Sequence, residues 1–315
     1  MPRRLLPRRI LAAIAFLAAP LATAGRCAAD TPAVVASIAP LHSLVAGVMA
    51  GVGAPALLIR PGASPHAYAF KPSEARALRH AKVVFWIGEG LETFLARPLR
   101  SLSGEAVVVE MTRVPGVVLH RARAGGIWEG RADDRDHDHE GHNPHLWLDP
   151  VNAKAWVEAI ARELTAADPA NGAAYAANAR AMRQRLDALI EELEAVLAPV
   201  RQRPYVVFHD AYHYFEARFR LNAVGSVAVS PDRPPGARRL IEIRDGLRAR
   251  QAACLFAEPQ FPPRLARTAI EGTGARLGTL DPLGAAIPNG PEMYFQLLRS
   301  LAADLGACLG GSTSR

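Results

Sequence analysis

Residues 168–200 read DPANGAAYAANARAMRQRLDALIEELEAVLAPV, and this stretch decides the organisation of the chain. Asp168 is a favourable N-cap residue, and Pro169 suits the first position of a helix. Apolar residues then recur at helical spacing as far as Pro199. About 30 residues at 1.5 Å each would span roughly 45 Å. We therefore predict one long, rigid helix that divides the chain and restricts hinge opening between its halves.

Short β-rich runs alternate with helical patterns on both sides of this helix. Such alternation predicts mostly parallel sheets with helices on both faces. The predicted fold class is α/β, with an N-terminal domain at 30–167, the linker helix at 168–200 and a C-terminal domain at 201–315. The predicted strands are 33–38, 56–59, 82–87, 106–109, 205–208, 223–228, 253–256 and 276–280. The predicted helices, besides the linker, are 41–50, 73–79, 151–166, 211–219, 236–250, 263–271 and 292–309.

The first 24 residues have the pattern of a signal peptide. Arginines at positions 3, 4, 8 and 9 precede an apolar stretch at 10–21 and the small-residue cleavage site Ala22-Thr23-Ala24. The stretch is too short for a transmembrane helix, so we predict export to a bacterial periplasm. The two Arg-Arg pairs allow the twin-arginine route, but the general secretory route is favoured. Removing the four arginines lowers the formal net charge from +7 to about +3, which gives no reason to invoke nucleic acid.

The chain has three cysteines. Because the exported compartment is oxidising, we predict a disulfide between Cys254 and Cys308. Cys27 is then left over. Cleavage after Ala29 instead of Ala24 would remove it with the signal peptide and make the cysteine count even.

Three histidines lie in three separate motifs, each beside a turn or the end of an apolar run. They are His66 in GASPH (62–66), His145 in NPHLWLDP (143–150) and His209 in VVFHD (206–210). Prolines precede two of them and fix the backbone there. A lone histidine of this kind is more often structural than a metal ligand, but three such residues favour a metal site.

Asp281 in LDPLG (280–284) follows the same pattern as His209, because each comes directly after a predicted strand. In parallel sheets, ligands bind beyond the carboxyl ends of the strands. Three imidazoles and one carboxylate form the ligand set of a tetrahedral zinc site. Two of the four come from each half, so we predict a metal in the interdomain cleft. The alternative for Asp281 is a turn-forming role before Pro282.

Further polar side chains are candidates for supporting roles. Glu258 ends another predicted strand and is placed to accept a hydrogen bond from a ligand histidine. His213 lies four residues after His209, and a packing or supporting role is favoured over ligation. His42 follows the first strand and either faces the cleft or has an ordinary capping role.

Residues 123–142 lack apolar periodicity and are rich in Gly, Asp and His. This composition predicts an acidic, histidine-bearing loop. His137, His139 and His142 are candidates for a second, weaker zinc site. The alternative is a solvated loop, and both descriptions can hold at once.

The motifs together resemble the periplasmic zinc-binding proteins of bacterial high-affinity zinc uptake, a metal-binding class of solute-binding proteins for ABC transporters. The resemblance covers nearly all of the chain after the signal peptide and rests on residues 62–68, 88–92, 143–150, 208–215, 256–261 and 278–284. It implies two α/β domains linked by one long helix, a metal between them and a C-terminal disulfide. It also implies that residues 123–142 correspond to the family's charged loop, which is short here.

The resemblance further implies that His66, His145 and His209 are zinc ligands. Manganese and iron relatives typically carry a carboxylate where His209 stands, and imidazole suits zinc better than manganese. Some zinc members have Glu directly before the first ligand histidine. Here that position is Pro65, which leaves Asp281 or a water as the fourth ligand.

The function expected from these features is that of a monomeric, non-enzymatic carrier. It would hold Zn²⁺ as cargo and deliver it to the membrane permease of an ABC importer. Ligand histidines must be neutral, so the affinity should fall below about pH 6.5. One alternative is the same fold carrying manganese or iron. Another is a zinc hydrolase, which is disfavoured because the sequence has no HExxH motif and no evident general base.

Overall fold

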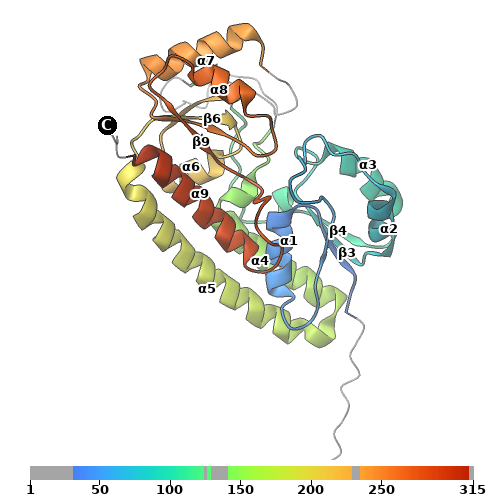
Figure 1. Cartoon of the computed structure of the whole chain (residues 1–315). Coiled ribbons are helices and arrows are strands. Elements are labelled where there is room, and N and C mark those ends of the chain that lie inside the picture. The colour runs from blue at the N-terminus through green and yellow to red at the C-terminus, as the bar shows by residue number, and fades with distance from the viewer. Residues whose placement is uncertain (1–30, 124–125, 129–140, 229–234, 312–315) are drawn as a thin grey trace, which may run out of the picture. The chain divides into compact units, whose positions relative to one another are not determined.

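The computed structural model describes residues 31–123, 126–128, 141–228 and 235–311. The described residues form two separate sheets (Figure 1), and the predicted α/β fold class is confirmed. The N-terminal sheet is parallel and has the order β2-β1-β3-β4. Its strands are β1 (Val34–Ala36), β2 (Ala56–Leu57), β3 (Val83–Trp86) and β4 (Val107–Glu110).

The C-terminal sheet has the order β5-β7-β6-β8-β9. Its strands are β5 (Gly126–Ile127), β6 (Tyr205–His209), β7 (Ala223–Ala228), β8 (Cys254–Ala257) and β9 (Arg276–Thr279). The four strands β6 to β9 pair in parallel, whereas β5 pairs antiparallel to β7. The sequence did not predict β5. Two residues in a glycine-rich segment carry no strand periodicity, and pairing with β7 creates the strand.

The helices pack around these sheets. They are α1 (Ala39–Val48), α2 (Pro72–His80), α3 (Thr93–Leu102), α4 (Pro150–Ala167), α5 (Gly172–Leu197), α6 (His213–Phe219), α7 (Ala237–Ala249), α8 (Arg264–Ile270) and α9 (Met293–Leu309). Helix α3 was missed because Pro98 lies inside it, and proline disfavours a helix interior. Burial of Leu95 and Leu99 against the N-terminal sheet supports the helix in spite of this proline.

The long joining helix is present as a continuous run: a 3-10 turn at Pro169–Asn171, helix α5, and a second 3-10 turn at Ala198–Val200. Figure 1 shows α5 running along α4 and α9, and it also contacts α1. Asp168 is the N-cap residue of the first 3-10 turn and Pro169 opens that turn, as the sequence predicted. The Asp168 carboxylate accepts hydrogen bonds from the side chains of Asn171 and Tyr175, each at 2.8 Å, and α5 begins after Asn171.

The two halves share one continuous apolar core. Helix α9 packs on α1 and α5. The Tyr294 amide donates to Ser43 Oγ at 2.9 Å, and the Tyr294 hydroxyl donates to the Trp147 carbonyl at 2.6 Å. The indole of Trp147 in turn donates to the Pro282 carbonyl at 2.7 Å. These buried contacts between the halves agree with the expectation of restricted hinge opening.

The predicted disulfide between Cys254 and Cys308 is confirmed and ties β8 to α9. The predicted domain bounds remain a prediction, and the predicted signal peptide lies outside the described residues. Within the described ranges, every helix is too short or too polar to cross a bilayer.

Candidate metal centre

His66, His145 and His209 converge on one point, although the chain separates them widely. One ring nitrogen from each lies within 4.8 Å of the others. The Nε2 atoms of His66 and His145 are 3.2 Å apart, and those of His145 and His209 are also 3.2 Å apart. A tetrahedral zinc ion with Zn–N bonds of about 2.0–2.1 Å holds its nitrogens about 3.3 Å from one another. The spacing therefore fits a tetrahedral metal ion.

Each histidine is placed by a different kind of local structure. His66 is half-buried in the loop between β2 and α2, where Gly62 turns the chain with a φ of +80°. His145 directly precedes the 3-10 turn Leu146–Leu148, which leads into α4. His209 is the last residue of β6, at the carboxyl edge of the C-terminal sheet, as its sequence context predicted. His145 and His209 are both buried.

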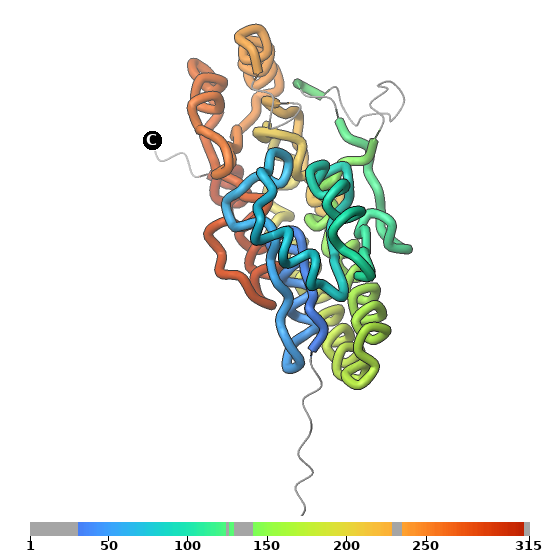
Figure 2. The backbone as a smooth tube through the Cα atoms, turned by 90° about the vertical axis from the view of Figure 1, so that its right-hand side faces the viewer, coloured from blue at the N-terminus to red at the C-terminus, as the bar shows by residue number. Residues whose placement is uncertain are grey.

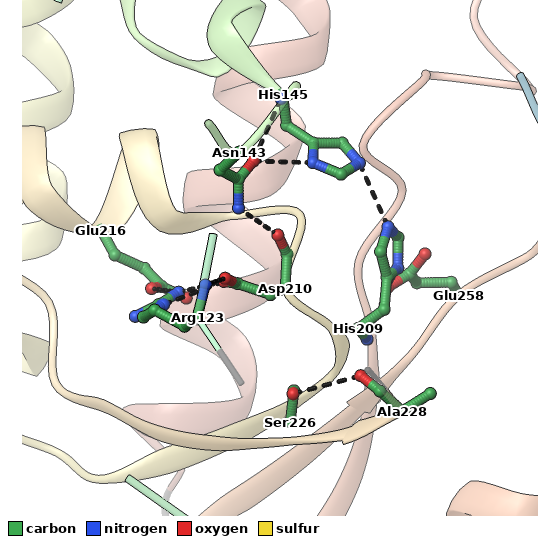
Figure 3. Close-up of polar contacts among 9 residues, drawn as sticks. All are labelled: Arg123, Asn143, His145, His209, Asp210, Glu216, Ser226, Ala228 and Glu258. Atoms are coloured by element: carbon green, nitrogen blue, oxygen red, sulfur yellow. Dashed lines mark hydrogen bonds and ion pairs between the residues drawn. The ribbon is translucent and has the colours of Figure 1, made fainter. Parts of the chain in front are cut away.

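Hydrogen bonds fix which nitrogen of two rings carries the proton (Figure 3). Asn143 Nδ2 donates to the Asp210 carbonyl at 2.6 Å, so Asn143 Oδ1 accepts from His145 Nδ1–H at 2.8 Å. His209 Nδ1–H donates to Glu258 Oε1 at 2.7 Å. In the neutral, metal-binding form of both rings, the Nε2 lone pairs of His145 and His209 face each other across 3.2 Å, and a cation between them would relieve this repulsion.

Burial keeps two of these rings uncharged. Burial first, and repulsion from His209 second, lower the pKa of His66 to about 3. Burial first, and then the other two histidines, lower the pKa of His145 well below its usual value. Both imidazoles are neutral near pH 7, which is the form that binds a metal ion.

Glu258 is a buried carboxylate beside this cluster, and only 3 % of its surface is exposed. Oε1 holds His209, whereas Oε2 has no hydrogen-bond partner among the described residues. A buried carboxylate is costly unless it is paired or fully hydrogen-bonded. A cation bound by His209 would supply the missing positive charge.

An apolar wall surrounds the polar cluster. The pocket is lined by Ser64, Pro65, His66, His145, Trp147, His209, Glu258, Gln260, Phe261, Pro282 and Leu283. Residues from both halves contribute to it, in agreement with the prediction of a site between them. The aromatic and proline side chains limit solvent access, which strengthens electrostatic interactions inside the pocket.

Asp281 is not brought into the histidine cluster. Its Oδ1 accepts from Gln260 Nε2 at 2.7 Å and from the Leu283 amide at 3.0 Å, and its Oδ2 accepts from the Ala285 amide at 2.6 Å. The carboxylate thus closes its own loop after β9, as in the turn-forming alternative. The sequence placed Asp281 at the correct edge of the sheet but could not give the direction of its side chain.

His42 and His213 also lie outside the cluster. His42 Nε2 contacts the Pro55 carbonyl at 3.1 Å from within α1. His213 is the first residue of α6 and stacks on His120, with ring centroids 4.8 Å apart. Because His209 ends a strand, the four-residue spacing to His213 does not place the two rings on one helix face. His120 is half-buried in this stack.

Of the loop histidines, only His142 is described; it is exposed and forms an isolated antiparallel β-bridge with Arg121. His137 and His139 lie outside the described residues. The sequence reasoning also missed three polar residues near the ligands: Arg123, Asn143 and Asp210. Two of them could have been found by position, since Asn143 lies two residues before His145 and Asp210 directly follows His209.

Comparisons with known proteins give the same assignment over most of the chain. Residues 34–308 match the family described as "ZnuA: Zinc-uptake complex component A periplasmic". The High-affinity zinc uptake system protein ZnuA of Brucella abortus (strain 2308) is 43 % identical over 316 residues, which cover 90 % of this chain and 93 % of that protein. The ZnuA protein of Yersinia pestis is 37 % identical over 308 residues, covering 94 % and 96 %.

A solved crystal structure of ZnuA superposes with a TM-score of 0.75 at 25 % identity. The match covers 89 % of this chain and all of that structure. The sequence and fold comparisons agree with the three-histidine geometry. The chain therefore belongs to the ZnuA family, the periplasmic component A of zinc-uptake complexes.

Proposed function

We propose that this chain captures Zn²⁺ in the periplasm at His66, His145 and His209 and delivers it to the membrane permease of an ABC importer. As a member of this family, the chain is a non-enzymatic binding component of zinc uptake. Zinc is its cargo rather than a catalytic cofactor.

One observation carries the proposal: two imidazole lone pairs, both fixed by hydrogen bonds from the opposite ring nitrogen, face each other at 3.2 Å. Holding the two lone pairs this close raises the free energy of the folded protein unless a cation binds between them. Three imidazoles without a carboxylate in the cluster suit zinc better than manganese or iron, which favour more oxygen ligands.

The same geometry argues against hydrolysis. Of the described residues that line the pocket, Glu258 alone carries a carboxylate, and that group is engaged by His209 Nδ1. Its Oε1 orients the ring of a candidate metal ligand, which is a supporting role rather than that of a general base. Because Asp281 is committed to backbone amides, we infer that a water completes the coordination.

Metal titration of the metal-free mature protein tests the proposal. Zn²⁺ and Mn²⁺ are titrated in competition with a chelator, and the bound metal is counted. We expect one tight zinc per chain that excess manganese does not displace. Tight manganese binding, or no tight site, would contradict the proposal. A further weak zinc that disappears when His137, His139 and His142 are replaced would belong to the histidine-bearing loop.

The export step is proposed separately. We infer that residues 1–24 direct export and are then removed. The mass of the protein recovered from the periplasm distinguishes cleavage after Ala24 from cleavage after Ala29, and thereby shows whether Cys27 is retained. Recovery of the protein from the cytoplasm, with residues 1–24 intact, would contradict this step.

A further inference from the structure

Arg123 lies in the N-terminal half of the sequence, but its side chain, which is 17 % exposed, bonds to residues of the C-terminal half (Figure 3). Its guanidinium donates to the carboxylate of Asp210, including a 3.0 Å bond from Nε, and to Glu216 Oε2 at 2.6 Å. Its own amide donates to Asp210 Oδ2 at 3.0 Å. The guanidinium also lies over the Trp128 ring, 3.7 Å from its centroid.

The chain around Arg123 is held in place on both sides. The Ala122 amide donates to the Gly141 carbonyl at 3.3 Å, and the Asn143 amide donates to the His120 carbonyl at 2.8 Å. Figure 2 shows these two green segments side by side. Beyond Arg123, the strand β5 joins the edge of the C-terminal sheet. The segment therefore fastens one half of the chain to the other.

A short hydrogen-bond path leads from Arg123 to two of the candidate ligands. Asp210, which Arg123 holds, directly follows His209. The Asp210 carbonyl accepts from Asn143 Nδ2 at 2.6 Å, and Asn143 Oδ1 accepts from His145 Nδ1–H at 2.8 Å. Fixing Asp210 thus fixes the turn after His209 and the amide that orients His145.

The ion pairs around Arg123 have a geometry that fixes the positions of the two carboxylates. Asp210 and Glu216 are both buried, and a single guanidinium bonds to both of them. Buried ion pairs are weak evidence for stability, because desolvation offsets their attraction. A planar guanidinium bonded to two carboxylates does, however, restrict geometry.

We propose that Arg123 is a positioning residue for the metal centre. It holds the turn after His209 and, through Asn143, the ring of His145, so that their Nε2 atoms remain 3.2 Å apart before the metal arrives. Preorganised ligands bind more tightly because less ordering is required on binding. This inference rests on the proposed zinc site.

The test compares Arg123→Lys with the matched control Arg218→Lys. Arg218 also makes a two-point bond to a buried carboxylate, that of Asp149. Asp149, unlike Asp210, caps α4 and does not bond to Asn143, the residue that orients His145, among the described contacts. Zinc affinity is measured by chelator competition, and the site geometry is read from the visible absorption of the Co²⁺-loaded protein. Lysine keeps the charge but cannot bridge two carboxylates with a planar fork.

We expect Arg123→Lys to weaken zinc binding about tenfold and to change the Co²⁺ spectrum, as is typical for residues that support metal ligands. Arg218→Lys should leave both unchanged. If Arg123→Lys does not fold, Asp210→Asn breaks the same contact and should give the same two changes. Wild-type affinity and spectrum in the folded Arg123 or Asp210 variant would overturn the inference, as would equal losses in Arg218→Lys. Failure of the wild-type protein to bind zinc would instead overturn the proposed function.

Discussion

Replacing Glu258 with glutamine should change the zinc affinity and the stability of the metal-free protein in different ways. Glutamine keeps an oxygen that can accept from His209 Nδ1–H, so the tautomer of the ring is preserved. The substitution removes the negative charge. A hydrogen bond to a charged group contributes about 1.5–3 kcal/mol, compared with about 0.5–1.5 kcal/mol for a neutral one. The bound state should therefore lose about 1–1.5 kcal/mol, or about tenfold in zinc affinity.

The metal-free protein should respond differently to the same change. One oxygen of the buried Glu258 carboxylate has no partner among the described residues, so the charge is poorly compensated before zinc binds. Removing it should leave the melting temperature of the metal-free protein unchanged or raise it. Zinc affinity is read from chelator competition, and stability from thermal unfolding with and without zinc.

Asp281→Asn is the matched control for this experiment. Asp281 is a partly buried carboxylate on the neighbouring loop, and its oxygens accept from backbone amides. We expect this variant to lose stability but to keep its zinc affinity. Wild-type zinc affinity in Glu258→Gln would refute the argument about Glu258. A loss of affinity in Asp281→Asn with unchanged stability would show that Asp281 is a ligand.

Three further outcomes are expected. His66 in the unfolded chain takes up a proton below about pH 6.5, whereas burial lowers the pKa of His66 in the folded protein to about 3. The metal-free protein should therefore lose stability as the pH falls between these two values. The loss from His66 alone should be about 2 kcal/mol at pH 5. Urea unfolding of His66→Gln should show a correspondingly weaker pH dependence; an identical slope would contradict the assignment. Replacing Cys254 and Cys308 by serine should cost about 4 kcal/mol in the free energy of unfolding in the chain-entropy model, and a loss below 1 kcal/mol would refute that estimate. Saturating zinc should raise the melting temperature of the wild-type protein but not of His145→Ala.

The sequence predicted the framework because strand and helix periods are local signals. The position of His209 at the carboxyl edge of the C-terminal sheet could be predicted from the apolar run of β6 alone, because His209 comes at the end of that run. Strand β5 and helix α3 were missed because pairing with β7 and burial of leucines, respectively, override weak or contrary local signals. Such tertiary effects cannot be obtained from a window of sequence.

The polar contacts of the site were less predictable than its ligands. Asp281 and His209 follow strands in the same way, yet one side chain turns to its own loop and the other to the histidine cluster. The contacts of Arg123 with Asp210 join residues 87 positions apart. Only the folded chain brings such partners together, and neither residue has a local pattern that indicates the other.

In the proposed site, three imidazoles from separate parts of the chain hold one zinc ion. Zinc X-ray absorption on the zinc-loaded mature protein measures this coordination most directly. We predict a first shell at about 2.0–2.1 Å with the outer scattering of three imidazole rings, reduced to two rings in each of His66→Ala, His145→Ala and His209→Ala. Sulfur in the first shell, or three-ring scattering that persists in any one of these variants, would contradict it.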